Sequence, residues 1–370
     1  MHVPFCYKKC NYCDFNSYES KEYLYERYFM ALEKEVDGYN FTEEVKSIYI
    51  GGGTPSIVPP IFIENIIKRL YSKFSVSDVA EITIETNPGT LSLEKLKRYK
   101  RVGINRLSIG LQASKQSLLE KLGRCHSLDA FLESFSLAKQ VGFDNISVDL
   151  MFGVPRQTMQ DLENTLDLLL SLSLNHISCY SLKIEDGTVF GELFNKGEIE
   201  YLDEDLERKM YYYAKDVFKA NGFKHYEISN FAKTGFESVH NNNYWECGEY
   251  IGLGAGAHSY YKDLRYSNTS NLEKYISLLE NRSDLSERIE TNQRIDEDEK
   301  RLEFMILGLR KLVGVSDFEF KKRFGESLFD RFGEKIQNLE FDGFVKCDGK
   351  RLFLTDKGLD FANKVMADFL

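Results

Sequence analysis

Three cysteines near the start of the chain have the type and spacing that could hold a metal centre. Cys6, Cys10 and Cys13 follow one another at the spacing C-x3-C-x2-C. Thiolate ligands suit zinc or iron–sulfur chemistry. A structural zinc site normally takes four protein ligands, and an ordinary ferredoxin cluster takes four cysteines. Three cysteines without an obvious fourth therefore favour a [4Fe–4S] cluster with one iron left open for another ligand.

Two other interpretations of this stretch remain open from the residues alone, because short motifs carry a false-positive risk. His2 could complete a Cys3His zinc site, or the three cysteines could be unrelated core residues. The total of seven cysteines is odd, which argues against a disulfide framework and favours a reducing, cytoplasmic compartment. The other four cysteines are scattered and are interpreted as structural: Cys125, Cys179, Cys247 and Cys347.

Composition excludes several classes of function. The chain has 370 residues, enough for two or three domains. It carries 48 Lys and Arg against 58 Asp and Glu, and its net charge of −10 argues against a nucleic-acid partner. No apolar run approaches the ~18–20 residues of a membrane span, so we expect no stable membrane insertion. The beginning of the sequence shows no basic region followed by an apolar run, so no secretory signal is expected.

Strand and helix patterns alternate up to about residue 186. With the segment that leads into the cysteines, six strands are expected, the other five being Ser47–Ile50, Glu81–Thr86, Arg106–Gln112, Asn145–Asp149 and His176–Leu182. Helices are expected between them at Lys21–Val36, Ile61–Lys73, Leu91–Arg101, Lys115–Leu122, Leu128–Val141 and Met159–Leu172. This alternation predicts βαβ units and a parallel sheet with too few strands for a complete eight-stranded barrel.

The regular alternation of strand and helix patterns ends at about residue 187. We expect a long helix at Asp203–Ala220, a strand at Tyr226–Phe231 and a polar linker at residues 283–300. The remaining segment shows helical patterns and a hairpin across Asp348-Gly349. Its charge is close to balanced, so it is not interpreted as DNA-binding. Three domains are expected, with the limits 1–186, 187–290 and 291–370.

The cysteine spacing resembles the signature of the radical S-adenosylmethionine (SAM) enzymes. In that family the open iron of the cluster chelates the amino and carboxylate groups of SAM, and an electron from the cluster can cleave SAM to a 5′-deoxyadenosyl radical. Pro4-Phe5-Cys6 with Tyr12-Cys13-Asp14-Phe15 is similar to the coproporphyrinogen-oxidase-like branch, and within it to the HemW-type heme chaperones. The resemblance implies an α/β fold, with a partial (βα)6 TIM-like barrel, an α+β extension and a C-terminal helical, winged-helix-like domain.

Polar residues and glycines at the ends of the expected strands are candidates for holding SAM. Glycines let backbone groups approach a ligand, and a carboxylate at such an edge can accept hydrogen bonds from ribose hydroxyls. Each residue taken alone could equally be a turn, a strand cap or a surface charge. The resemblance implies SAM contacts for Gly52, Gly53, Thr54, Glu85, Gln112, Arg124 and Asp149. A further SAM contact of that family, a tyrosine, stands immediately before the position of Met1 and is not supplied by this sequence.

The segment His240-Asn-Asn-Asn-Tyr-Trp245 holds the only tryptophan. Histidine is a common heme ligand, although a histidine beside aromatic residues is more often a satisfied core residue. The pattern H-N-x-x-Y-W resembles the heme-associated segment of the HemW-type proteins. It implies that His240 ligates the iron or supports its ligand and that Tyr244 and Trp245 pack against the porphyrin. His258 is a lower-ranked candidate.

The sequence and the resemblance leave two candidate functions. The first is a heme chaperone that holds a cluster and SAM and passes heme to an acceptor protein, with a reduced electron donor as further partner. The second is oxygen-independent coproporphyrinogen III oxidase, a SAM-dependent enzyme that forms protoporphyrinogen IX by oxidative decarboxylation. Phe15 occupies the place of an additional cysteine in the oxidase pattern, and the sequence lacks the oxidase's long N-terminal extension. Both departures favour the chaperone, and whether SAM is turned over is left open.

Overall fold

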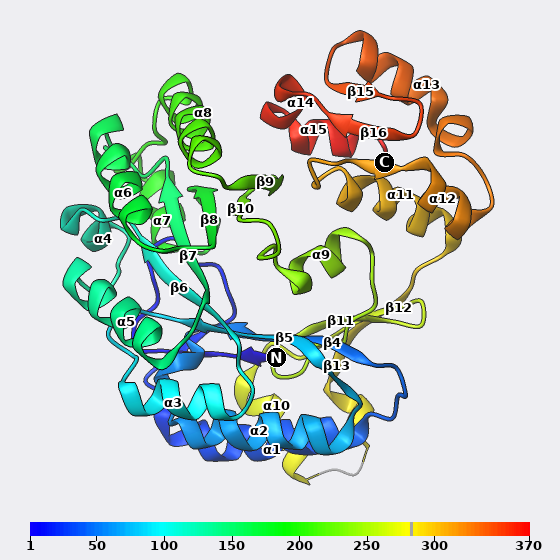
Figure 1. Ribbon diagram of the computed structural model, residues 1–370. Coiled ribbons are helices and arrows are strands. Elements are labelled where there is room, and N and C mark those ends of the chain that lie inside the picture. Colours follow the sequence, from blue (N-terminus) through cyan, green and yellow to red (C-terminus); the bar gives the residue numbers. More distant parts are fainter. Residues whose placement is uncertain (282–283) are drawn as a thin grey trace.

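The main sheet of the protein is built by its first 232 residues. A computed structural model describes residues 1–281 and 284–370 (Figure 1). The strands of this sheet are β1 (His2–Val3), β4 (Val45–Gly52), β5 (Val76–Thr86), β6 (Arg106–Gln112), β7 (Asn145–Phe152), β8 (His176–Ser181), β9 (Lys224–Glu227) and β10 (Asn230–Ala232). They lie in the order β1-β4-β5-β6-β7-β8-β10-β9. The six strands from β1 to β8 pair in parallel and confirm the partial (βα)6 barrel.

Helices cover the outer face of the parallel strands (Figure 1). Polar residues fix where several of them begin, since the side chains of Ser92, Ser127 and Thr158 accept hydrogen bonds from backbone N–H groups of the first turn. Gly142, in the left-handed region at φ 87°, ends α5. The helices are α1 (Tyr25–Gly38), α2 (Pro60–Lys73), α3 (Leu93–Arg101), α4 (Gln116–Lys121), α5 (Leu128–Val141), α6 (Met159–Ser171), α7 (Val189–Asn195) and α8 (Glu204–Ala220).

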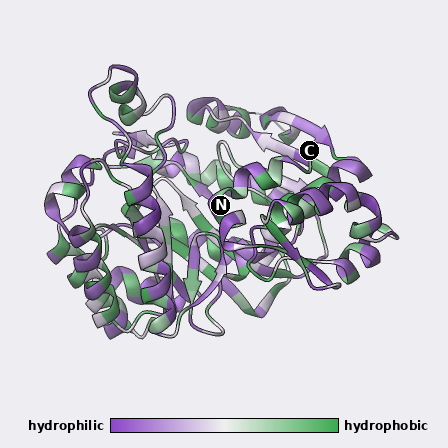
Figure 2. Ribbon diagram, turned by 90° about the horizontal axis from the view of Figure 1, so that it is seen from above, coloured by the Kyte–Doolittle hydropathy of each residue, from purple (hydrophilic) through white to green (hydrophobic). Residues whose placement is uncertain are grey.

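The core lies between the sheet and these helices. All seven residues of β6 are buried, and Leu107, Ile109 and Leu111 among them belong to the hydrophobic core. Ile84, Leu107 and Val148, on three neighbouring strands, are completely buried in one continuous cluster. Figure 2 shows hydrophobic residues concentrated along the strands and mixed with hydrophilic ones on the surrounding helices. The outer face of the sheet therefore provides stability and leaves the strand ends available for a site.

The strand expected at Tyr226–Phe231 is wrong in one respect, because this segment is a hairpin. Glu227 ends β9, and its side chain accepts hydrogen bonds from Ser229 N and Asn230 Nδ2. These contacts close a tight turn between β9 and β10, and β10 then pairs antiparallel with β8. The apolar residues of this segment alternate as in a single strand. The turn contains no glycine or proline that would indicate it, because the Glu227 carboxylate closes it.

The linker expected at residues 283–300 is also wrong for the described part of that segment; Ser283 lies outside the described residues. Residues 284–300 hold η3 (Leu285–Arg288), β13 (Ile289–Arg294) and the beginning of α11 (Glu297–Gly308). β13 pairs antiparallel with β12 (Leu264–Asn268), which pairs with β11 (His258–Tyr261). β13 is an exposed edge strand that is held by backbone hydrogen bonds to β12. Its side chains are mostly polar, so the sequence shows no alternation of apolar and polar residues there.

A buried carboxylate joins the first helix to this later segment. Glu35 of α1 is completely buried and accepts hydrogen bonds from Gly254 N (2.8 Å), Asn268 Nδ2 (2.7 Å), Tyr275 Oη (2.6 Å) and Arg288 Nε (2.9 Å). Tyr275 belongs to α10 (Leu272–Asn281), which packs against α1. Residues 254–281 and 284–288 are therefore held against the start of the barrel.

The C-terminal segment has a hydrophobic core of its own, formed around Met305, Phe320, Leu352 and Phe369. Its sheet has the order β14-β16-β15, and the hairpin predicted across Asp348-Gly349 is confirmed. Helices with this hairpin make a winged-helix-like domain. Its elements after α11 are β14 (Val315–Ser316), α12 (Asp317–Phe324), α13 (Leu328–Phe341), β15 (Val345–Cys347), β16 (Arg351–Leu354), α14 (Asp356–Asp360) and α15 (Ala362–Ala367). We keep 1–186, 187–290 and 291–370 as proposed domain limits.

No helix within residues 1–281 or 284–370 combines the length and the apolar character that a membrane crossing requires.

Candidate functional site

The three clustered cysteines lie on a loop between two short strands. β2 (Phe5–Cys6) and β3 (Tyr18–Glu19) pair in parallel and bring the two ends of the loop together. Cys6 is buried, Cys10 and Cys13 are half-buried, and all seven cysteines of the chain are free. His2 is engaged elsewhere, since its Nε2 donates to Asn16 O at 2.7 Å. In the described part of the chain no three His, Cys, Asp or Glu side chains are grouped as the ligands of one metal ion are.

The surroundings of the cysteines suit a [4Fe–4S] cluster, whose thiolates bind different irons rather than one point. Cys6 Sγ lies 3.6 Å from Thr54 Oγ1, and the Arg124 guanidinium donates to Cys10 Sγ at 3.5 Å. Burial raises the pKa of the Cys6 thiol, and it raises the pKa of Cys13 to about 11. Such thiols need a metal or a cation to ionise. The donor set fits the cluster, and Arg124 supplies a compensating positive charge.

The glycine turn that follows β4 is built into the cysteine loop. Gly53 N donates to Val3 O at 2.9 Å and Thr54 N donates to Phe5 O at 2.7 Å. A Cβ on Gly53 would stand 2.6 Å from Phe5 O, so no larger residue fits there. Gly52 has φ 115°, a conformation that favours glycine. The turn thus positions the cysteine loop, a role that sequence reasoning missed.

Three predicted SAM residues line one cavity of about 340 Å³, here named the barrel cavity. Glu85, Gln112 and Asp149 reach it from the neighbouring strands β5, β6 and β7. Tyr12 and Phe15 border it from the cysteine loop. The parallel strands therefore bring these residues together beside the cluster loop.

The two carboxylates of the barrel cavity have raised pKa values. Burial raises the pKa of Glu85 to about 7, although it accepts hydrogen bonds from Tyr49 Oη (2.7 Å) and Gly52 N (3.1 Å), and the nearby Asp149 raises it further. Burial also raises the pKa of Asp149, which accepts from Ser108 Oγ at 3.2 Å. Two acidic groups held close together in a cavity suit a ligand that brings positive charge and hydroxyl donors.

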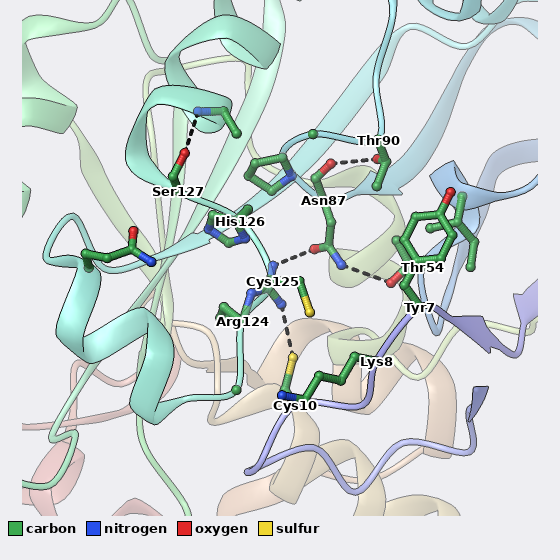
Figure 3. A pocket seen from close by; sticks show the side chains of 16 residues that line it. Tyr7, Lys8, Cys10, Thr54, Asn87, Thr90, Arg124, Cys125, His126 and Ser127 are labelled. Atoms are coloured by element: carbon green, nitrogen blue, oxygen red, sulfur yellow. Dashed lines mark hydrogen bonds between the residues drawn. The ribbon is translucent and has the colours of Figure 1, made fainter. Parts of the chain in front are cut away.

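Thr54 and Arg124, two other predicted SAM residues, line a second cavity of about 440 Å³ together with Cys10 (Figure 3). Arg124 donates through Nη2 to Asn87 Oδ1 at 2.6 Å and to Gly110 O at 2.7 Å. Asn87 Nδ2 in turn donates to Thr54 Oγ1 at 2.9 Å. Five of the predicted SAM residues are thus divided between two cavities, whereas Gly52 and Gly53 line neither of them. Asn87, which directly follows the strand expected at Glu81–Thr86, was not among the predicted SAM residues.

The His240–Trp245 segment forms a short helix, α9 (Val239–Trp245). The Ser238 side chain accepts from Asn241 N at 3.2 Å, and Glu81 of β5 accepts from Val239 N and His240 N at 3.1 Å each. The helix therefore begins where a carboxylate of the main sheet meets its free N–H groups. Sequence reasoning predicted no helix here, because consecutive asparagines are poor helix formers.

His240 is fully engaged in contacts. Its ring shares hydrogen bonds with Ser47 Oγ (2.9 Å) and Tyr244 Oη (3.0 Å), and it stacks on Tyr49 with a centroid distance of 5.0 Å. Burial lowers the pKa of His240 to about 3, so the imidazole is neutral. A neutral imidazole is the form that ligates metals. Through its contacts with Ser47 and Tyr49 of β4, the His240 side chain also holds α9 against β4.

The structure does not bring the three predicted heme residues into one cavity. His240 borders an aromatic cavity of about 310 Å³, Tyr244 borders one of about 300 Å³, and Trp245 borders one of about 530 Å³. The last two cavities are both lined by α11 of the C-terminal domain. His258 lies exposed at the start of β11.

Comparison with known proteins supports the radical SAM assignment. Residues 1–169 match the Radical SAM superfamily, and residues 295–361 match the HemN C-terminal domain. The heme chaperone HemW of Bacillus subtilis is 39% identical, with 100% of this chain and 98% of the relative covered. The chain belongs to the HemW family of radical SAM proteins. A second HemW, from Lactococcus lactis, is 36% identical over 100% of this chain and 96% of its own length.

A solved structure shows the same fold as this HemW-family chain. Coproporphyrinogen III oxidase (HemN) from Escherichia coli, described as a radical SAM enzyme, superimposes with a TM-score of 0.86. The alignment covers 100% of this chain and 88% of the oxidase chain, at 22% sequence identity. At this identity the likeness establishes the barrel and its C-terminal domain, and it does not choose between the functions of HemW and HemN.

Proposed function

We propose that this chain is a heme chaperone, which binds heme and transfers it to an acceptor protein. The observation that carries the proposal is the full-length similarity to two HemW heme chaperones at 39% and 36% identity. Phe15 supports it, because the coproporphyrinogen oxidase pattern has a further cysteine there, whereas Phe15 borders the barrel cavity of this chain. Heme is the cargo, and the acceptor protein is a partner still to be identified.

The cofactors that we propose are one [4Fe–4S] cluster on Cys6, Cys10 and Cys13 and one SAM molecule beside it. When bound and reduced by an electron donor, the cluster supplies an electron that can cleave SAM. Arg124 would offset the negative charge of the cluster at Cys10, which it already contacts. Glu85 would accept hydrogen bonds from the ribose hydroxyls of SAM, with Gln112 and Asp149 bordering the same cavity. The glycine turn keeps the cluster loop next to this cavity.

We place this activity in the cytoplasm, with no nucleic-acid partner. Seven free cysteines suit a reducing compartment. The net charge of −10 would repel a phosphate backbone.

The test compares heme binding and coproporphyrinogen turnover on the same anaerobically reconstituted protein. We expect a heme Soret band that is shifted from that of free heme, with no formation of protoporphyrinogen. Transfer to a heme-free acceptor protein should then shift the band to that of the acceptor. Conversion of coproporphyrinogen without heme uptake would overturn the proposal in favour of the oxidase.

A further inference from the structure

A cavity of about 530 Å³ lies where the end of α9 meets the C-terminal domain. Trp245 borders it from α9, and Phe304 and Gly308 border it from α11. The remaining walls come from β14, α12 and β16. We call it the Trp245 cavity. Its volume is in the range of small-molecule sites.

The lining of the Trp245 cavity is cationic although the whole chain is acidic. Four basic side chains line it against two acidic ones, Glu246 and Glu319, in a protein of net charge −10. The basic residues are Lys311, Lys322, Arg323 and Arg351. A concentration of positive charge in a cavity attracts anionic ligands.

Three of these cations have no carboxylate partner among the described residues: Lys322, Arg323 and Arg351. Lys311 is paired with Glu246 at 2.6 Å, and Arg323 donates to the carbonyls of Glu246 and Cys247 at 3.2 and 3.0 Å. Arg351 likewise reaches only backbone carbonyls, at the longer distances of 3.3 and 3.4 Å. Within the described ranges Lys322 makes no hydrogen bond or ion pair and is exposed. Lys322 and Arg351 are therefore available to a ligand.

Aromatic surface accompanies this charge. The Arg310 guanidinium lies 4.4 Å from the centroid of the Trp245 ring, which keeps the indole in place at the cavity wall. The buried indole Nε1 has no hydrogen-bond partner in the described part of the chain. Aromatic surface next to the available cations Lys322 and Arg351 fits a planar aromatic ligand that carries carboxylates. Heme, with its two propionates, has this chemistry.

The aromatic cavity at His240 is less suitable for such a ligand. It contains many aromatic side chains, but Glu43, Glu44 and Glu249 also line it against one basic side chain, Lys46. Two propionates would meet like charges there, which is unfavourable. The distribution of charge therefore decides between the two cavities.

We infer that the Trp245 cavity binds heme through its propionates, with Lys322 and Arg351 as carboxylate partners and Trp245 against the macrocycle. The inference rests on the proposed function. It adds the cavity in which heme binds and the orientation in which the propionates face the basic residues. It assigns to the C-terminal domain a direct part in holding the cargo. His240 then supports the site from the other side of α9 through its hydrogen bond to Tyr244.

The test compares heme with its dimethyl ester, in which both propionates are neutral. Each ligand is titrated into the wild-type protein and into the Lys322→Gln/Arg351→Gln double variant, with the Soret band as readout. Two ion pairs with carboxylates predict that the wild type prefers heme over the ester by roughly 5- to 30-fold. The double variant should lose this preference and bind the ester as the wild type does, which also shows that it is folded.

Lys346→Gln is the matched control, because Lys346 is an exposed lysine of β15 outside the cavity lining. It should keep the full preference for heme. A double variant that still prefers heme, or a wild type that binds both ligands equally, would overturn this inference and leave the chaperone proposal standing. A wild type that takes up neither ligand would overturn both.

Discussion

Glu85 is the residue whose chemistry depends most on its surroundings. It accepts hydrogen bonds from Tyr49 and Gly52 and shares the barrel cavity with Asp149. If it also accepts bonds from the ribose of SAM, each charge-assisted bond contributes about 1.5–3 kcal/mol. We therefore expect Glu85→Ala to weaken SAM binding by ~10- to 100-fold, as measured by calorimetry. An unchanged affinity would show that Glu85 only caps its strand.

The raised pKa of Glu85 gives the protein a pH dependence with a definite sign. The folded-state pKa is about 7 and the ordinary value is 4.5, so the folded protein binds the proton more tightly. The contribution of Glu85 to stability is therefore complete below pH 4.5 and is lost as the pH rises through 7. Chemical unfolding of the wild type and of Glu85→Gln between these pH values should show a difference that changes in this direction. A constant difference would contradict the pKa assignment.

The cysteine loop gives a second prediction for a single residue. We expect Cys10→Ala to lose the [4Fe–4S] cluster, because three thiolates in one loop leave no spare ligand. Iron and sulfide analysis after anaerobic reconstitution measures the loss. Cys125→Ala is the control, since Cys125 is an exposed cysteine that lines the same cavity as Cys10. Full iron retention by Cys10→Ala, or one equivalent of zinc in the wild type, would contradict the assignment.

At the residue scale, the strand ends were predictable and the loops were not. Glu85, Gln112 and Asp149 could be grouped because parallel strands carry their ends to one edge. The contacts of Arg124 with Cys10, Asn87 and Gly110 O depend on a loop after α4, whose course no periodicity reveals. Its position came from the family pattern alone.

At the scale of elements, α9 depends on contacts with other parts of the chain. Its intrinsic helix propensity is low. Hydrogen bonds that involve Glu81 and Ser238 at its start, together with the ring contacts of His240, stabilise it instead. Local sequence could not show this, because Glu81 lies 157 residues away from Ser238. The βαβ elements were found to within a few residues, since each carries its own apolar pattern.

His240→Ala tests the coupling of α9 to β4. The variant loses the hydrogen bonds to Ser47 and Tyr244 and the stacking on Tyr49, so we expect the free energy of unfolding to fall by about 1–3 kcal/mol. We also expect the Soret band of the heme-loaded variant to be altered or lost. His258→Ala serves as the comparison at an exposed histidine. A normal band in a folded His240→Ala protein would remove His240 from the heme site.

At the scale of the whole molecule, Glu35 connects segments that are distant in sequence. It is an acceptor for groups from residues 254 to 288, including the buried Arg288. Glu35→Ala leaves that guanidinium without its buried counter-charge, which typically costs about 3–5 kcal/mol. Denaturant unfolding should show a loss of this size, whereas Glu26→Ala, at an exposed position of the same helix, should change little. Equal losses in the two variants would contradict the network.

The connection between the proposed domains could not be predicted from composition. A polar segment was expected to be a linker, whereas β13 within it is paired and Arg288 before it is buried. Burial of a charged pair is invisible in a single sequence, because the same residues are most often exposed.

The position of β1 has a consequence for how the protein is made. His2 N donates to Leu253 O, so the strand that carries the cysteine loop is completed by residues near position 253. Chains emerge from the ribosome N-terminus first, at about 5–20 residues per second. The cysteines are therefore synthesised roughly 10–50 seconds before the segment that holds their strand in place. Until residues near position 253 have emerged, the strand that carries the cysteine loop lacks this contact, so we expect stable binding of a cluster only after that point in synthesis.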